Sequence, residues 1–137
     1  MPTIVRFGVS MEAELLRAFD ALIEKKGYTN RSEALRDLVR EALNAQAWAE
    51  GEEVLGVITL FYDHRKRELL SRLTEAQHHA HASVLATLHI HVDEERCLEV
   101  IAVRGRAQEV QELADRLCAE PGVLLGRLCP AGTFGRF

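Results

Sequence analysis

The sequence predicts an α+β protein with two domains, a strand-helix-helix unit over residues 1–48 and a βαββαβ unit over residues 53–137. The chain has 137 residues, which is enough for two small domains. Apolar residues alternate near the N-terminus, and two segments with helical spacing follow them. A short polar linker, AEGEE, then leads into a second series of strand-like and helix-like segments.

The first unit begins with a strand over residues 3–10, in which apolar residues alternate with polar or small ones. One face carries Val5, Phe7 and Val9, and the other carries Arg6, Gly8 and Ser10. Helices are expected over residues 11–27 and 29–48, the first ending at Gly27 and the second capped by Asn30. The second helix has an apolar stripe that is expected to be buried, formed by Leu35, Leu38, Val39, Ala42 and Leu43.

This first unit cannot be stable as a single copy. One strand leaves its backbone hydrogen-bonding groups unpaired, and about 50 residues bury too little apolar surface for independent stability. Two chains can pair their strands as an antiparallel ribbon over four packed helices. The sequence therefore predicts an obligate dimer through residues 1–48.

The second unit has the element order of a split-βαβ, ferredoxin-like domain. Strands are expected at residues 53–62, 83–92, 97–105 and 122–130, and helices at residues 63–81 and 106–120. Asp63 is the candidate cap of the first of these helices. The tail at residues 131–137 is expected to be loose.

Composition restricts the possible partners and compartment. The net charge of −4 gives the whole molecule no attraction to nucleic acid or anionic membrane. No apolar run approaches the ~20 residues of a membrane span, and the N-terminus lacks the layout of a signal peptide. The three cysteines, Cys97, Cys118 and Cys129, form no CxxC motif and argue for a reducing compartment. We expect a cytoplasmic protein without membrane contact.

Residues 77–97 hold five of the six histidines and one cysteine, which suggests a metal site. His89 and His91 are two apart in a strand, so both side chains point to one face, while Leu88, Ile90 and Val92 are expected to point into the core. Cys97 shares the histidine face if it pairs with His91, and the opposite face if it pairs with Val92. His78, near the end of the preceding helix, points away from its own core and can reach a neighbouring chain.

Three imidazoles and one thiolate suit Zn, Cu or Ni, and sequence spacing does not reveal whether the arrangement is tetrahedral or planar. For His79 and His81, exposure to solvent is preferred over ligation. Three function classes are compatible with such a site: a metal-sensing repressor, a metal store or chaperone, and a metalloenzyme with an open coordination position. The chain has no GxSxG or HExxH motif, and a storage protein does not require the strand-helix-helix unit.

The segments RFGVS, GYTNRSEALRD and QHHAH…LHIHVDEERCLEV together resemble the NikR family of nickel-responsive transcriptional regulators. The resemblance covers nearly the whole chain. It implies an N-terminal ribbon-helix-helix DNA-binding domain, a C-terminal ACT-like domain, and a homotetramer in which two DNA-binding dimers flank four regulatory domains. It also implies square-planar Ni(II) held by His89, His91 and Cys97 of one chain and His78 of a partner chain.

By the same resemblance, Arg6, Gly8 and Ser10 face the bases of double-stranded operator DNA. Gly8 has no side chain with which to contact a base, so Arg6 and Ser10 are the expected readers; an arginine on a ribbon can bind guanine bidentately. Residues 1–48 carry seven basic and seven acidic residues, so no basic patch marks this surface. Phosphate contacts are expected from Arg31, with Lys66 and Arg67 as candidates that could equally be solvated.

Further groups are expected around the metal ligands, because a ligating histidine usually donates its other N–H group. Gln77, Glu99 and Tyr62 are the candidates for this role. Glu33 and Asp37 match acidic residues that hold a cation between domains in some relatives, although a helix cap and a surface carboxylate explain them equally well. The sequence thus predicts a nickel-dependent DNA-binding repressor of nickel uptake genes rather than an enzyme, with a metal store, a chaperone or a metalloenzyme as the alternative.

Overall fold

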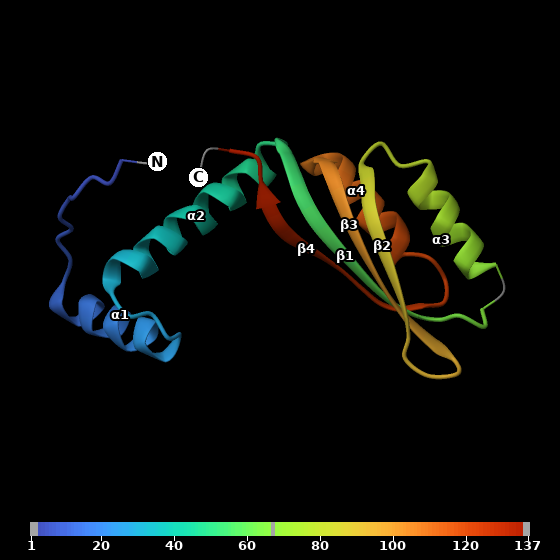
Figure 1. Ribbon diagram of the computed structural model, residues 1–137, viewed down its shortest axis with the longest axis horizontal. Helices are drawn as coiled ribbons and strands as arrows, with labels where there is room; N and C mark the ends of the chain where they lie inside the picture. The colour runs from blue at the N-terminus through green and yellow to red at the C-terminus, as the bar shows by residue number, and fades with distance from the viewer. Residues whose placement is uncertain (1–2, 67, 136–137) are drawn as a thin grey trace. The chain divides into compact units, whose positions relative to one another are not determined.

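The computed structural model describes residues 3–66 and 68–135 (Figure 1). The chain divides into two compact units, residues 1–41 and residues 42–137. The helices and strands follow the order α1, α2, β1, α3, β2, β3, α4, β4. The boundary falls within α2, which begins in the first unit and ends in the second.

The first unit contains α1 (Ala13–Lys25) and the beginning of α2 (Arg31–Ala49). Gly27 follows α1 with a φ of 87°, a left-handed conformation that costs glycine little. The backbone N–H of Glu33 donates to Asn30 Oδ1 at 2.9 Å, so the predicted helix cap is confirmed.

Residues 3–10 form no strand in the described part of this single chain, whereas the sequence predicts a strand that pairs with the same strand of a second copy. A strand needs a partner to accept and donate its ladder hydrogen bonds, and the described residues of one chain supply none here. The apolar side chains remain in solvent: Val5 is 75% and Phe7 80% exposed. The predicted stripe on α2 is also open, with Leu38 and Val39 44% and 56% exposed. Exposed apolar surface of this extent marks a site of association.

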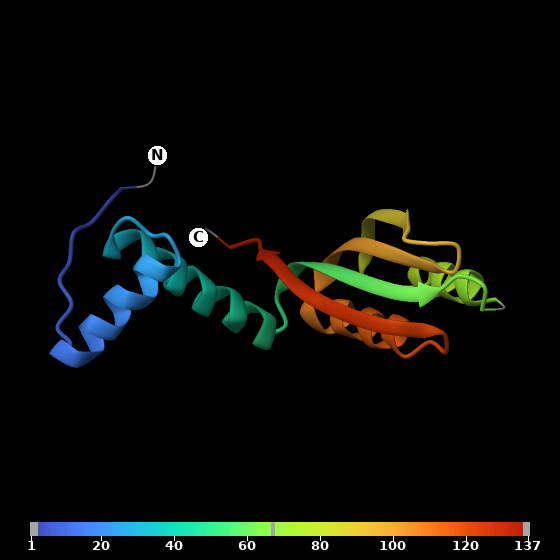
Figure 2. The same ribbon diagram turned by 90° about the horizontal axis from the view of Figure 1, so that it is seen from below.

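The second unit is a four-stranded antiparallel sheet with two helices on one face (Figures 1 and 2). Its strands are β1 (Glu53–Asp63), β2 (Ser83–His91), β3 (Arg96–Arg106) and β4 (Val123–Thr133), in the spatial order β2-β3-β1-β4. The helices are α3 (Leu69–His78) and α4 (Ala107–Cys118). This is the predicted βαββαβ topology.

Alternation along the two central strands builds the core. In β1 every second residue from Val54 to Tyr62 is buried, and β3 shows the same pattern from Cys97 to Val103. These side chains pack with the apolar stripes of the two helices, Leu69, Leu73 and Ala76 from α3 and Val110, Leu113 and Leu117 from α4. Burial of this continuous apolar surface is the main stabilising contribution to the unit.

Several local expectations for the second unit are wrong. Leu88, Ile90 and Val92 are 59%, 40% and 52% exposed rather than buried, because both helices cover the opposite face of the sheet. Helix α3 begins at Leu69, since the Asp63 carboxylate accepts the Arg65 backbone N–H at 2.9 Å and closes a turn before the helix. β4 extends to Thr133, so the first part of the tail is ordered.

No described helix is long and apolar enough to cross a membrane.

Leu117→Ala should lower the free energy of unfolding by about 2–5 kcal/mol, because it removes a fully buried leucine and leaves a cavity. Urea unfolding at one fixed protein concentration measures this change. The control is the exposed neighbour on the same helix, Arg116→Ala, which should change stability by less than about 0.5 kcal/mol. Equal losses for both variants would contradict the packing described for α4.

Candidate metal centre

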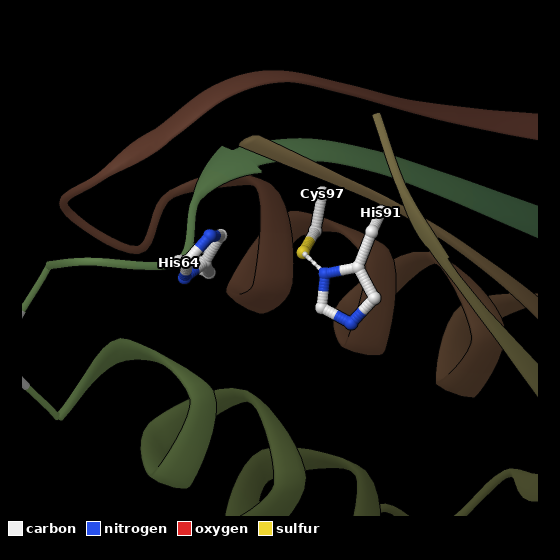
Figure 3. A group of neighbouring side chains, drawn as sticks. All are labelled: His64, His91 and Cys97. Carbon is white, nitrogen blue, oxygen red and sulfur yellow. Dashed lines mark hydrogen bonds between the residues drawn. The ribbon is translucent and has the colours of Figure 1, made fainter. Parts of the chain in front are cut away.

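The pairing of β2 with β3 places a histidine directly opposite the buried cysteine. His91 pairs with Cys97 and His89 with Glu99, so the first of the two registers considered from the sequence is the observed one. Paired residues project to the same side of a sheet, here the side that carries the helices. Cys97 Sγ lies 3.4 Å from His91 Nδ1, and Figure 3 shows the two side chains facing each other.

His64 is a third potential ligand at this position, and the sequence reasoning missed it. Its donor atom and those of His91 and Cys97 all lie within 4.8 Å of one another. His64 Nε2 lies 2.6 Å from the backbone carbonyl of Glu94, to which it can only donate a hydrogen bond, so Nδ1 keeps its lone pair. A signal for His64 was its place in the sequence, directly after the last residue of β1. That residue, Asp63, pairs with Arg96, which is the neighbour of Cys97 in β3.

His89 shares the face of His91, as predicted, but both of its ring nitrogens have other partners. Nδ1 lies 3.4 Å from the Tyr62 hydroxyl, and Nε2 lies 3.4 Å from Glu99 Oε1. Burial, reinforced by the nearby Glu99, raises the pKa of Tyr62 well above its usual value, so the hydroxyl remains a donor. The carboxylate can only accept, so we assign the imidazole proton to Nε2 and the lone pair to Nδ1.

Glu99 is an unusual residue for this core, since it is only 2% exposed. Its Oε1 accepts a hydrogen bond from Gln77 Nε2 at 3.1 Å, and the Gln77 carbonyl oxygen accepts one from Thr87 at 3.3 Å. Glu99 Oε2 is buried and has no hydrogen-bond partner in the described part of the chain. The three predicted supporting residues, Tyr62, Gln77 and Glu99, therefore lie together around His89.

His78 lies apart from this cluster. It is the last residue of α3, it is exposed, and its ring packs edge-on against His79 with 5.6 Å between ring centres. It lines an open groove together with His64, Lys66 and Glu75. His79 and His81 are both exposed, as expected.

The protonation state of Cys97 affects what the site can bind. Burial raises the pKa of the Cys97 thiol, and the charges of Glu99 and Asp93 raise it further, so the thiol is protonated at neutral pH without a metal. A metal must displace this proton to bind the sulfur. Imidazole and thiolate donors suit a borderline transition metal such as nickel, copper or zinc, so the residues present fit a nickel ion.

The candidate DNA-binding residues occupy different environments. Arg6, Gly8 and Ser10 are exposed. The Arg31 guanidinium forms two hydrogen bonds of 2.8 Å to the Asp20 carboxylate, so a phosphate contact would have to compete with this pair. Lys66 is exposed at the groove, and Arg67 lies outside the described residues.

The two acidic residues considered as a cation site already have hydrogen-bond donors within the first unit. Asp37 Oδ2 accepts the Tyr28 hydroxyl at 2.6 Å, and its Oδ1 accepts from Arg40 at 3.1 Å. The same contact with the Asp37 carboxylate raises the pKa of Tyr28. Glu33 Oε2 accepts from Thr29 at 3.1 Å. These bonds favour the interpretation of both residues as local structural groups of this unit.

Two family models match separate parts of the chain. Residues 5–46 match the ribbon-helix-helix protein, copG family, and residues 55–130 match the NikR C terminal nickel binding domain. A solved structure of an uncharacterized protein from Thermotoga maritima shares the fold of the second unit, with a TM-score of 0.52 and 16% identity over 58% of this chain and 98% of that one.

Curated relatives match over nearly the full chain. A protein from Geobacter sulfurreducens is 52% identical over 97% of this chain and 96% of its own length, and one from Caldanaerobacter subterraneus is 48% identical over 95% and 85%. Both carry the name of a nickel-responsive regulator. The family models that match and the regulator names of these relatives place the chain among regulators rather than enzymes. The chain belongs to the family of nickel-responsive regulators that join a ribbon-helix-helix DNA-binding domain to a nickel-binding domain.

Proposed function

We propose that this protein is a repressor whose affinity for its operator increases when Ni(II) binds the second unit. The observation that carries the proposal is the gathering of imidazole and thiol groups on the helix-covered face of the sheet, with His91 and Cys97 in contact at 3.4 Å. The first unit carries the DNA-binding domain. A metal held by the second unit acts on DNA only by favouring one arrangement of the protein over others.

The proposed ligands are His89, His91 and Cys97 of one chain and His78 of a partner chain. The exposure of His78, and its position outside the His64–His91–Cys97 group, support its use by another chain. When bound, nickel supplies a strong link between the two chains. Tyr62, Gln77 and Glu99 orient His89: its Nε2–H group points to Glu99, and its Nδ1 becomes the metal donor when Tyr62 gives up its contact.

His64 is an alternative fourth ligand, because it already stands beside His91 and Cys97 within one chain. A set that includes His64 would bind metal without joining two chains. The distinction matters for function, since only a shared site gives the metal a different affinity for different assemblies. The mixing experiment described below separates these two possibilities.

The assembly proposed is a homotetramer. Pairing of residues 3–10 between two chains would satisfy their unpaired backbone groups and cover the apolar stripes of the first unit. The face of the sheet opposite the helices exposes Leu88, Ile90 and Leu125, and it suits a second interface, between the metal-binding units. The proposed domain limits are 1–48 and 53–137, and the family matches at 5–46 and 55–130, which lie inside them, support the proposal.

Operator recognition is proposed to depend on the paired strands. Arg6 and Ser10 read base edges in the major groove, while Gly8 allows close approach. Lys66 and Arg67 contribute contacts that are independent of base sequence, provided that DNA reaches the second unit. Arg31 reaches a phosphate only if its bonds to Asp20 are exchanged for that contact.

Cys97→Ala should abolish the thiolate-to-nickel charge-transfer band of the Ni(II)-loaded protein, because it removes the sulfur donor. Absorption titration of the full-length protein with Ni(II) measures the band and the number of ions per chain. Cys118→Ala and Cys129→Ala are the matched controls and should both keep the band. Retention of the band in Cys97→Ala would show that the sulfur ligand has been assigned wrongly.

A mixture of His78→Ala and Cys97→Ala chains should recover nickel sites that neither variant forms alone. In a mixed assembly, the first variant supplies an intact cysteine and the second supplies the missing histidine. The two proteins are unfolded together, refolded, and titrated with Ni(II) beside each variant treated in the same way. If all ligands come from one chain, His78→Ala alone keeps its sites and His64→Ala loses them.

Ni(II) should tighten operator binding by roughly 1–3 kcal/mol or more, the usual scale of allosteric coupling. Fluorescence anisotropy with a labelled operator, with and without Ni(II), measures the change. Arg6→Ala should lose the preference for operator over random DNA, whereas Lys66→Ala should weaken binding to both and reduce the salt dependence. Equal operator affinity with and without Ni(II) would show that the protein binds nickel but that nickel does not regulate its binding to DNA.

A further inference from the structure

The junction between α2 and β1 contains the segment that the sequence predicts to be a polar linker. In the structure, backbone hydrogen bonds tie this segment to the last turn of α2. The backbone N–H of Glu52 donates to Ala47 at 3.0 Å, and that of Gly51 donates to Trp48 at 3.3 Å. Gly51 has a φ of 72°. These features form a Schellman motif, which ends a helix in a fixed geometry.

The closed junction is also fastened to the start of α4. The backbone N–H of Ala107 donates to the carbonyl of Glu52 at 2.9 Å. A Cβ atom at Gly51 would lie 2.4 Å from the side-chain nitrogen of Gln108, so the two segments are packed without free space between them. A flexible linker makes neither of these contacts.

Trp48, on the last turn of α2, packs against the core of the second unit. Gly56 of β1 makes room for it: a Cβ at this position would lie 3.4 Å from the Trp48 ring and 3.1 Å from both Leu128 and Val110. One turn earlier, Asn44 Oδ1 accepts a hydrogen bond from the Thr133 hydroxyl at 2.8 Å. The end of β4 thus holds the same helix.

β1 connects this attachment to the metal centre. The strand runs from Val54 and Gly56, which lie at the α2 end, to Tyr62, which contacts His89. It is a central strand, paired along its length with both β3 and β4. Pairing on both sides restrains β1, so this strand is the continuous structural connection between the α2 attachment and His89.

We propose that Asn44, Trp48 and Thr133 are positioning residues that fix the last turns of α2 to the metal-binding unit. Residues 49–53 then do not act as a hinge, and any reorientation of the DNA-binding unit takes place before Asn44. Resting on the proposed function, the proposal makes this attachment the route by which nickel binding reaches the DNA-binding unit.

The test uses the full-length protein and two variants of one residue. Thr133→Val removes the hydroxyl that bonds to Asn44, and Thr133→Ser keeps it. Trp48 is the only tryptophan of the chain, so acrylamide quenching of its fluorescence reports directly on the attachment. Quenching is measured without metal. Nickel affinity and operator affinity with and without Ni(II) are measured on the same samples.

Thr133→Val should raise the quenching of Trp48 and leave the nickel affinity and charge-transfer band unchanged. The nickel-dependent gain in operator affinity should fall by about fivefold, the scale of one lost neutral hydrogen bond. Thr133→Ser should behave as the parent protein. A second pair tests the packing: Gly56→Ala crowds Trp48 and should reduce the gain, whereas Gly132→Ala meets nothing within 4 Å and should not.

Two outcomes would overturn the proposal. The first is that Trp48 of the parent protein is quenched as readily as a free tryptophan derivative. The second is that Thr133→Val loosens Trp48 while the nickel-dependent gain stays the same. If the parent protein shows no gain at all, the proposed function fails, and hydrogen exchange of the Gly51 and Glu52 amides decides on the attachment. Protected amides support a fixed junction, and amides that exchange as in an unfolded chain refute it.

Discussion

The antiparallel register between β2 and β3 is the constraint on which the metal centre depends. A shift by one residue would move His89 and His91 to the open face of the sheet and leave Cys97 alone beneath the helices. The register is held from both sides. Cys97 and Glu99 belong to the buried alternation of β3, and the turn after β2 is closed by Asp93, whose carboxylate accepts the Glu95 and Arg96 backbone N–H groups at 2.9 and 2.8 Å.

Placing the metal centre on the buried face of the sheet introduces polar groups into the core, which lowers the stability of the unit. Glu99 is buried with one oxygen that has no hydrogen-bond partner among residues 3–66 and 68–135, and burial keeps the Cys97 thiol protonated. An unsatisfied buried acceptor lowers stability by about 1–3 kcal/mol. Such groups are retained where a function uses them. Here they surround the histidine that is proposed to change partner when nickel binds, so the metal-free site is prepared for binding but incomplete.

A single chain is also incomplete at its surfaces. Phe7 and Leu88, which lie in different units, both stay more than half exposed, and His78 lies outside the group formed by His64, His91 and Cys97. These features share an explanation in which further copies of the chain cover the apolar faces and supply the missing ligand. In contrast, one chain already forms the apolar packing of Trp48 and the hydrogen bond of Asn44 within the second unit, while the buried Trp48 Nε1 has no hydrogen-bond partner among the described residues. The attachment of α2 therefore does not depend on assembly.

The sequence by itself determined the element order from α1 to β4, the shared face of His89 and His91, and the Asn30 cap, because these follow from local periodicity and backbone hydrogen bonding. Local patterns also singled out Tyr62, Gln77 and Glu99. Only the tertiary structure decided which face of the sheet the helices cover, which exposed Leu88 and Ile90. It alone brought His64 to Cys97 and Thr133 to Asn44, because contacts between residues distant in sequence depend on strand order and packing, which no local pattern encodes.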